Sequence, residues 1–201
     1  MPSMWDATKT NAWRAQVNLL ERCREDVGAD RIELPAVSLA KEAPVIVLGL
    51  DPGTERSALV ELDDGTVKLA EIFENEKMLS LLRELGPQNR MVISRLVIEK
   101  FESFGMIVGR EVFEAVFWSG RFAEAWGGQF EPLSRRKVKL HLCGDSRAKD
   151  PNVRQALIDR YGGKESIRKG GPLYGVHKDC WSALALCTVW EDLHCGVPEV
   201  A

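Results

Sequence analysis

The chain has 201 residues, of which 45% are hydrophobic, and its formal net charge is −3. This length and composition suffice for one globular domain with a core of ordinary size, together with a short extension. They exclude a protein that attracts nucleic acid through its overall charge, so any such function has to come from a local surface.

The five cysteines are odd in number and follow no disulfide spacing, which indicates reduced thiols in a cytoplasmic protein. The N-terminus lacks the apolar segment of a signal peptide. The longest apolar run, residues 45–50, is far too short to cross a bilayer. We therefore expect a soluble cytoplasmic protein with no membrane partner.

Residues 1–43 are predicted to form a helical extension and linker, and residues 44–201 the main domain. Trp13, Val17 and Leu20 form a helical stripe, and a polar segment with Pro35 follows them. Two interpretations stay open for this extension. Its helix packs on the main domain, or it is a free arm that binds a partner.

The main domain begins with a predicted meander of three strands, because apolar segments are separated by turn residues. The turn "DDGT" at residues 63–66 has the Asp-Gly pair of a hairpin. The strands are expected at residues 45–50, 57–62, 67–73, 91–98 and 138–143.

Apolar residues at helical spacing predict four helices in the same domain. The helices are expected at residues 77–85, 110–126, 152–161 and 179–193. Strands in a meander, followed by strands that alternate with helices, indicate an α/β domain with a mixed sheet flanked by helices.

Three acidic residues occupy comparable places in this pattern. Asp51 ends the first strand, Glu99 ends the run "MVISRLVI", and Asp179 starts the last helix. Such positions gather at one edge of an α/β sheet. Three carboxylates in one cleft repel each other unless cations lie between them, and hard oxygen ligands suit Mg²⁺ or Mn²⁺. The pattern therefore predicts a metal site for phosphodiester chemistry.

The segments "GLDPGTERSALVEL", "LVIEKF" and "HKDCWSALALC" resemble the RuvC-type Holliday junction resolvases over about residues 44–193. The segment "FGMIVGREVFEAVFWSGRF" is more similar to the bacteriophage branch of that family than to the cellular one. The resemblance implies an RNase H-like fold, with a mixed five-stranded sheet flanked by helices. It also implies a homodimer that binds four-way DNA junctions, in the cytoplasm of a bacterial host if a bacteriophage encodes the protein.

By this resemblance Asp51, Glu99 and Asp179 are the catalytic, metal-binding acids. The sequence departs from the family at Ser182, where a hydroxyl replaces the second acid of a pair. Three interpretations follow. Three acids suffice, His177 helps to position water, or the protein binds junctions and cuts them poorly.

Residues 131–170 hold eleven Lys or Arg against five Asp or Glu, which is typical of a phosphate-binding face. By resemblance Lys139 and Lys149 contact the DNA backbone, and Arg147 is a plausible neighbour. Phe101 or Phe104, which follow the second acid, would enter the junction and unstack bases. The alternative is that both phenylalanines pack under their loop.

Two other classes of site are less compatible with the sequence. His141, Cys143, His177 and Cys180 would form a zinc site, but their spacing matches no common zinc module. "DPGTERS" also resembles the first phosphate loop of actin-like ATPases. That fold needs two such domains, and no second loop of this kind is present.

The sequence therefore predicts a Mg²⁺- or Mn²⁺-dependent endonuclease that resolves Holliday junctions by paired symmetric nicks. A junction-binding protein with weak cleavage, or a nuclease for other branched DNA, is the alternative. Two nicks call for two active sites, and a C2 homodimer supplies them. The helix at residues 110–126 is the predicted interface, because Phe113, Phe117 and Trp118 exceed what one helix face buries.

Overall fold

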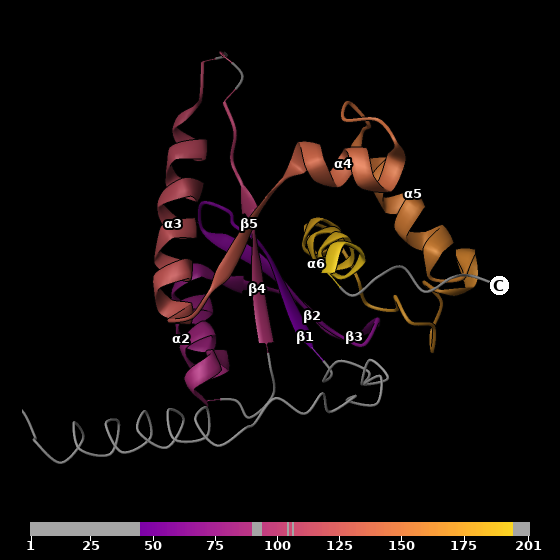
Figure 1. Cartoon of the computed structure of the whole chain (residues 1–201), viewed down its shortest axis with the longest axis horizontal. Helices are drawn as coiled ribbons and strands as arrows, with labels where there is room; N and C mark the ends of the chain where they lie inside the picture. Colours follow the sequence, from indigo (N-terminus) through magenta and orange to yellow (C-terminus); the bar gives the residue numbers. More distant parts are fainter. Residues whose placement is uncertain (1–44, 90–93, 104, 106, 195–201) are drawn as a thin grey trace, which may run out of the picture. The chain divides into compact units, whose positions relative to one another are not determined.

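The centre of the molecule is a sheet of five strands in the order β3-β2-β1-β4-β5 (Figure 1). The structure, a computed structural model, describes residues 45–89, 94–103, 105 and 107–194. The extension expected at residues 1–43 lies outside the described residues. The strands are β1 (Ile46–Asp51), β2 (Arg56–Asp63), β3 (Thr66–Glu74), β4 (Ser94–Lys100) and β5 (Phe130–Ser134).

The first three strands form an antiparallel meander, whereas β4 and β5 run parallel to β1. The predicted mixed sheet is therefore confirmed. Asp64 and Gly65 adopt φ values of 47° and 70° in the turn between β2 and β3. Two consecutive positive φ angles are what a tight hairpin turn requires, and they explain the Asp-Gly pair.

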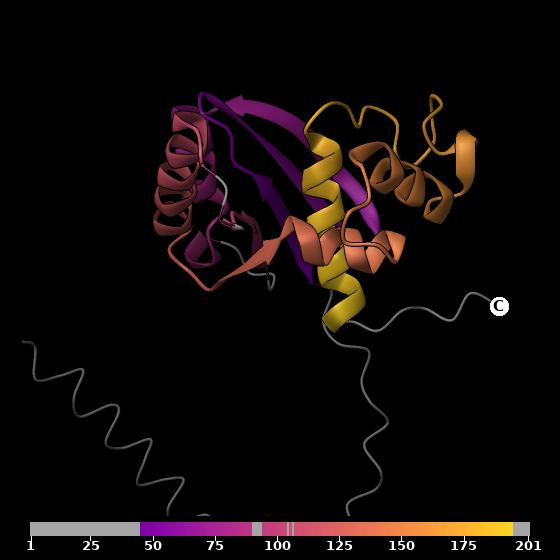
Figure 2. The same cartoon turned by 90° about the horizontal axis from the view of Figure 1, so that it is seen from above.

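Helices cover both faces of the sheet, as Figures 1 and 2 show. One face carries α2 and α3, and the other carries α6, beside which α4 and α5 lie. Within the described residues every helix is too short or too polar to span a bilayer. The helices are α2 (Asn75–Leu85), α3 (Arg110–Trp126), α4 (Arg135–Cys143), α5 (Asp150–Arg160) and α6 (Cys180–His194).

The central strands divide their side chains between two cores, because successive residues of a strand point to opposite faces. Val47 and Val97 belong to the core under α6. The core under α2 and α3 receives Leu48, Leu50, Leu96 and Ile98. By the same alternation, the odd-numbered residues Asp51 and Glu99 are expected on the α6 face.

Gly49 lets α6 approach β1 closely. A Cβ at this position would overlap the backbone carbonyl of Ala183 and approach the sulfur of Cys187 to 2.7 Å. Only glycine therefore permits this contact between the central strand and the helix, and the start of α6 is brought close to the end of β1.

The strand predicted at residues 138–143 is wrong, because this segment belongs to helix α4. Its alternating pattern also fits a helix in which Val138 and Leu142, four residues apart, face the core and Leu140 is exposed. The Ser134 hydroxyl accepts a hydrogen bond from the Lys137 N–H at 3.4 Å and caps the helix. The fifth strand is instead β5, a short edge strand that contains Pro132.

Candidate active site

A ring of hydrogen bonds fixes the turn that follows Asp51. The Gly53 N–H donates to the Ser57 hydroxyl (3.1 Å), which in turn donates to the Asn75 Oδ1 (2.7 Å). The Asn75 Nδ2 donates to the carbonyls of Gly53 (3.0 Å) and Thr54 (3.1 Å). Ser57 and Asn75 are buried, so these bonds do not compete with water. The backbone that carries Asp51 is therefore rigid.

Asp51 and Glu99 lie side by side at the ends of two neighbouring parallel strands. Leu50 pairs with Ile98 in the β1–β4 ladder, and the two acids are the next residues along their strands. Glu99 is 8% exposed, and Asp51 is half-buried. Burial, followed by the charge and hydrogen bond of the Glu99 carboxyl, raises the pKa of Asp51 well above its ordinary value. Two carboxyl groups so placed favour a cation or a shared proton between them.

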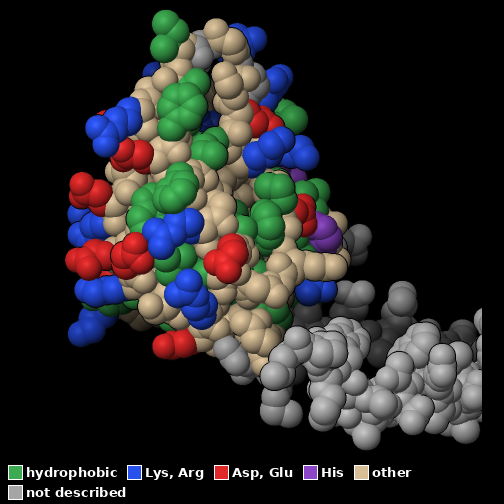
Figure 3. Space-filling view, turned by 90° about the vertical axis from the view of Figure 1, so that its left-hand side faces the viewer, with side chains coloured by type: hydrophobic (Ala, Val, Ile, Leu, Met, Phe, Trp, Pro, Cys, Tyr) green, Lys and Arg blue, Asp and Glu red, His purple; other side chains and the backbone are tan. Residues whose placement is uncertain are grey.

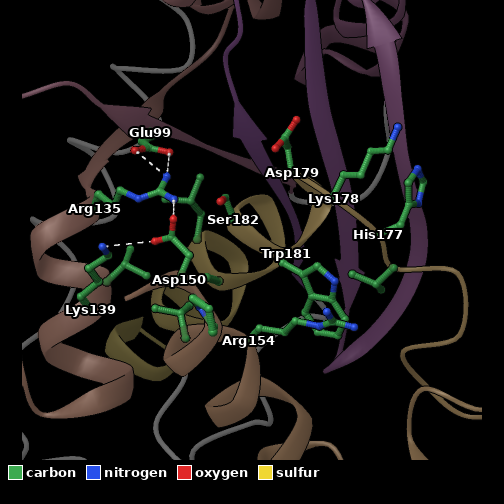
Figure 4. A pocket seen from close by; sticks show the side chains of 16 residues that line it. Glu99, Arg135, Lys139, Asp150, Arg154, His177, Lys178, Asp179, Trp181 and Ser182 are labelled. Carbon is green, nitrogen blue, oxygen red and sulfur yellow. Dashed lines mark hydrogen bonds and ion pairs between the residues drawn. The ribbon is translucent and has the colours of Figure 1, made fainter. Parts of the chain in front are cut away.

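Arg135 is the cation in contact with Glu99 of this pair (Figure 4). Its guanidinium lies 3.3 Å from each oxygen of Glu99 and 2.9 Å from the Asp150 Oδ2. Lys139 contacts the other Asp150 oxygen at 3.2 Å. Burial alone would raise the pKa of Asp150, but the bonds and charges of Arg135 and Lys139 outweigh it and hold that pKa below its ordinary value. A chain of ion pairs thus links Glu99 to α4 and α5.

Asp179 lies near these acids without joining them in one cluster. Its charge contributes to the raised pKa of Asp51, although less than Glu99 does. Among the described residues, no three His, Cys, Asp or Glu side chains are close enough to hold one metal ion. In Figure 4 Ser182 lies between Asp179 and the Glu99–Arg135 pair, whereas His177 lies beyond Asp179. The His177 Nδ1 is 2.8 Å from the carbonyl of Gly175.

The backbone is strained immediately before Asp179. Lys178 adopts a φ of 45°, in the left-handed region that residues other than glycine seldom occupy. Such conformations persist where the surrounding structure enforces them, often at functional sites. Here the turn at Lys178 directs the chain into α6, since the N–H groups of Ser182 and Ala183 bond to the Asp179 carbonyl at 3.0 and 3.2 Å.

The donor chemistry of the carboxylate pair fits a hard divalent cation. Asp51 and Glu99 offer oxygen atoms only, in a desolvated position where two negative charges need compensation. Asp179 is a further carboxylate whose charge acts on Asp51. The zinc alternative has no such set, because His141 lies on α4 with its Nε2 2.7 Å from the Asp192 carboxylate, and Cys180 is buried in the core.

The predicted DNA-binding residues are distributed around this site. Lys139 lines a pocket of about 530 Å³ that also contains Glu99 and Asp179, whereas Arg147 and Lys149 are exposed between α4 and α5. Phe101 is half-buried just after β4. Phe104 lies outside the described residues. The roles of all these residues stay predictions.

Arg135 and Asn75 are the residues that sequence reasoning missed. Arg135 could not be distinguished from the other basic residues of its segment, because strand β5, which precedes it, was not predicted. Recognition of β5 would have pointed to Arg135. This strand runs parallel to β4 with Leu133 opposite Glu99, so the residue after Ser134 lies at the same edge of the sheet as the carboxylates. The sequence gives less reason to select Asn75, since a polar residue at the start of a helix is usually exposed.

No family model matches this sequence, and no curated protein matches it. The fold does have solved counterparts. A structure of RuvC from Thermus thermophilus is similar with a TM-score of 0.55 and 17% identity, over 75% of this chain and 96% of that one. The same protein in complex with a Holliday junction substrate gives a TM-score of 0.52 and 18% identity, over 71% and 90% of the chains. The chain therefore has the RuvC-like, RNase H-type α/β fold.

Proposed function

We propose that this protein is a metal-dependent DNA endonuclease that resolves four-way junctions. The observation that carries the proposal is the Asp51–Glu99 pair, which lies at the ends of adjacent parallel strands and within the electrostatic influence of Asp179. The RuvC-like fold supports it, because one similar solved structure holds a Holliday junction substrate. A rigid pair of desolvated carboxylates suits the binding of a cation.

Asp51 and Glu99 would hold Mg²⁺ or Mn²⁺, with Asp179 as a further ligand. A bound divalent ion would supply the positive charge that favours attack of water on a phosphodiester. The hydrogen-bonded turn keeps Asp51 in place, and Arg135 orients the Glu99 carboxylate through both of its oxygens. The protein thus provides preorganised ligands, which is its main contribution to such a reaction.

Lys139, Arg147 and Lys149 would bind the phosphates of the DNA, and Phe101 and Phe104 would act near the exchange point. Phosphate contacts of this kind give affinity that depends on salt and carries little sequence information. They suit a substrate that is recognised by its branched shape.

A homodimer would place two such sites on one junction. Phe113 and Phe117 on α3 are each 64% exposed, and Val116 between them is 47% exposed. Figure 3 shows hydrophobic side chains gathered on this side of the molecule. An exposed aromatic patch on a helix is typical of a protein interface. A C2 pair formed through α3 would make two symmetric nicks.

A junction-binding protein that cuts poorly is the second candidate. It is favoured by the Ser182 hydroxyl, a weaker metal ligand than a carboxylate. The separation of Asp179 from the carboxylate pair also favours it, because three ligating acids do not meet in the described residues.

Cleavage of an end-labelled four-way junction, in Mg²⁺ and in Mn²⁺, tests the proposal. Wild type is compared with Asp51→Asn and with the control Asp63→Asn, which alters a carboxylate beside the opposite end of β1. We expect paired symmetric nicks from wild type and from the control, and none from Asp51→Asn. Tight junction binding without nicks in either metal would favour the second candidate.

A further inference from the structure

The pocket beside the carboxylates has an apolar part that metal binding does not explain. Glu99, Asp179 and Ser182 line one side of it, where α6 begins (Figure 4). A volume of about 530 Å³ is in the range of sites that take small organic groups. The remaining wall, between α4, α5 and α6, includes Val138, Val153, Val176, Trp181, Ala185 and Leu186.

Trp181 and Arg154 form a stacked pair in this wall. The Arg154 guanidinium lies over the indole ring, 4.9 Å from its centroid. Trp181 is 8% exposed and fixed within α6, whereas Arg154 is exposed on α5. The indole N–H donates no hydrogen bond to any residue that the structure describes. The pair therefore presents a flat cationic surface that the indole ring supports from behind, and an indole N–H without an acceptor among the described residues.

Planar heterocycles are the ligands that such a surface recognises. Nucleobases stack on aromatic rings and on guanidinium planes, and they carry acceptors at their edges. A charged group alone would not need the apolar wall, and an aliphatic ligand would not need Arg154. The position of the pocket favours a nucleobase over other heterocycles. Glu99 lines the pocket, so a phosphodiester bound at Asp51 and Glu99 would have its own neighbouring base within reach of it.

We propose that this pocket receives one unstacked nucleobase of branched DNA, next to the phosphate at the carboxylates. The inference rests on the proposed function and adds a second basis for substrate selection. In a duplex the base would first have to leave its stack, which is unfavourable. At an exchange point a base is already partly unstacked. The pocket would therefore favour branched DNA over linear DNA at the site of cleavage itself.

The test combines base removal with removal of the stacked pair. A series of four-way junctions is made, each with one abasic position near the exchange point, beside the intact junction. Dissociation constants are measured without divalent ions, so that no strand is cut, for wild type, Trp181→Ala and Arg154→Ala. Trp190→Phe is the matched control, since Trp190 is equally buried on α6 and donates instead to Glu131.

We expect wild type and Trp190→Phe to bind one abasic junction about tenfold more weakly than the intact junction, as stacking on one base implies. Trp181→Ala and Arg154→Ala should bind both junctions alike. Trp181→Phe should restore part of the difference. Because Arg154 is exposed, its variant tests the pocket even if Trp181→Ala does not fold.

Two results would overturn the inference. The first is a wild type that tolerates every abasic position. The second is a penalty that persists unchanged in Arg154→Ala, since the stacked guanidinium would then contribute nothing. A wild type that binds the intact junction no better than linear duplex of the same sequence would overturn the proposed function itself.

Discussion

The two faces of the sheet are built alike and used differently. Both are covered by helices over a core of aliphatic side chains. The α6 face ends in carboxylates, ion pairs and a pocket, whereas the α2–α3 face ends in an exposed aromatic patch. The carboxylates reach the α6 face because Leu50 and Ile98 point to the other face and successive residues of a strand alternate between faces.

This contrast shows how one strand serves two purposes. The even-numbered residues of β1 and β4 stabilise the α2–α3 core, and the odd-numbered ones lead to the candidate site. If the proposed function is right, chemistry belongs to the α6 face and association to the α3 face. Substitutions on each face show whether that division holds.

The largest effect is expected from Glu99→Gln. This change removes a proposed metal ligand and leaves Arg135 without one of its two carboxylate partners. Junction cleavage under single-turnover conditions should fall by more than about 100-fold, since even residues that only support metal ligands contribute 10–100-fold. Glu102→Gln, an exposed carboxylate beyond β4, is the control. Equal rates for both variants would contradict a catalytic α6 face.

A charge on α3 should separate the proposed dimer without damaging the candidate site. Phe117→Glu places a carboxylate in the exposed aromatic patch, and the dimer dissociation constant should rise by about 30-fold or more, as for a central interface residue. Sedimentation equilibrium measures this constant, with Glu84→Gln on α2 as the control. If Phe117→Glu remains a dimer of wild-type affinity, the interface lies elsewhere.

Asn75→Ala tests whether the division is strict, because Asn75 begins α2 and yet holds the turn of the candidate site. The variant leaves the Gly53 and Thr54 carbonyls without their donor and should lower the free energy of unfolding by about 1–3 kcal/mol. Urea unfolding measures this loss. Asn152→Ala, an exposed asparagine in α5, should change it by less than about 0.5 kcal/mol. Similar values would mean that the ring of hydrogen bonds has no special role.

The smallest effect is expected for Asp51→Asn, which should change the stability of the protein in a way that depends on pH. The pKa of Asp51 is raised by folding, so the folded protein binds more protons than the unfolded one above the ordinary aspartate pKa of about 3.9. The cost of ionised Asp51 therefore grows as pH rises from there to the raised pKa and is constant above it. Asp51→Asn removes this cost.

Without divalent ions, Asp51→Asn should have a higher Tm than wild type at neutral pH, by about 2–4 °C for each kcal/mol regained, and no advantage near pH 3. Thermal unfolding across this range measures the difference, with Asp63→Asn as the control. An advantage that is equal at all pH values would point to packing instead of charge.

The sequence was most informative where local signals agreed with tertiary structure. α3 has the predicted bounds, Arg110–Trp126, because glycine flanks it on both sides and Gly127 ends it with a φ of 66°. A strand was predicted within residues 135–143 because the four-residue spacing of Val138 and Leu142 fits the period of a strand as well as that of a helix. β5 was missed because a five-residue edge strand that contains proline gives a weak signal.

The candidate site could be predicted only in part, because only some of its features are local in the sequence. Asp51 and Glu99 each end a strongly apolar run, which is a local feature of the sequence. The partners of these acids depend on pairings between distant segments. Arg135 reaches Glu99 because β5 lies beside β4, and Asn75 reaches Gly53 because α2 starts beside the β1–β2 turn. No spacing in the sequence encodes either contact.

The pairing of β1 with β4 also has a consequence for the order of folding. The contacts among β1, β2 and β3 are local, whereas β4 reaches β1 only after two strands and a helix have intervened. Contacts between distant segments form late, because a longer loop has to close first. The meander that carries Asp51 would therefore form before β4 brings Glu99 beside it. A chain in which only the meander has formed would lack the carboxylate pair, and with it the proposed metal site.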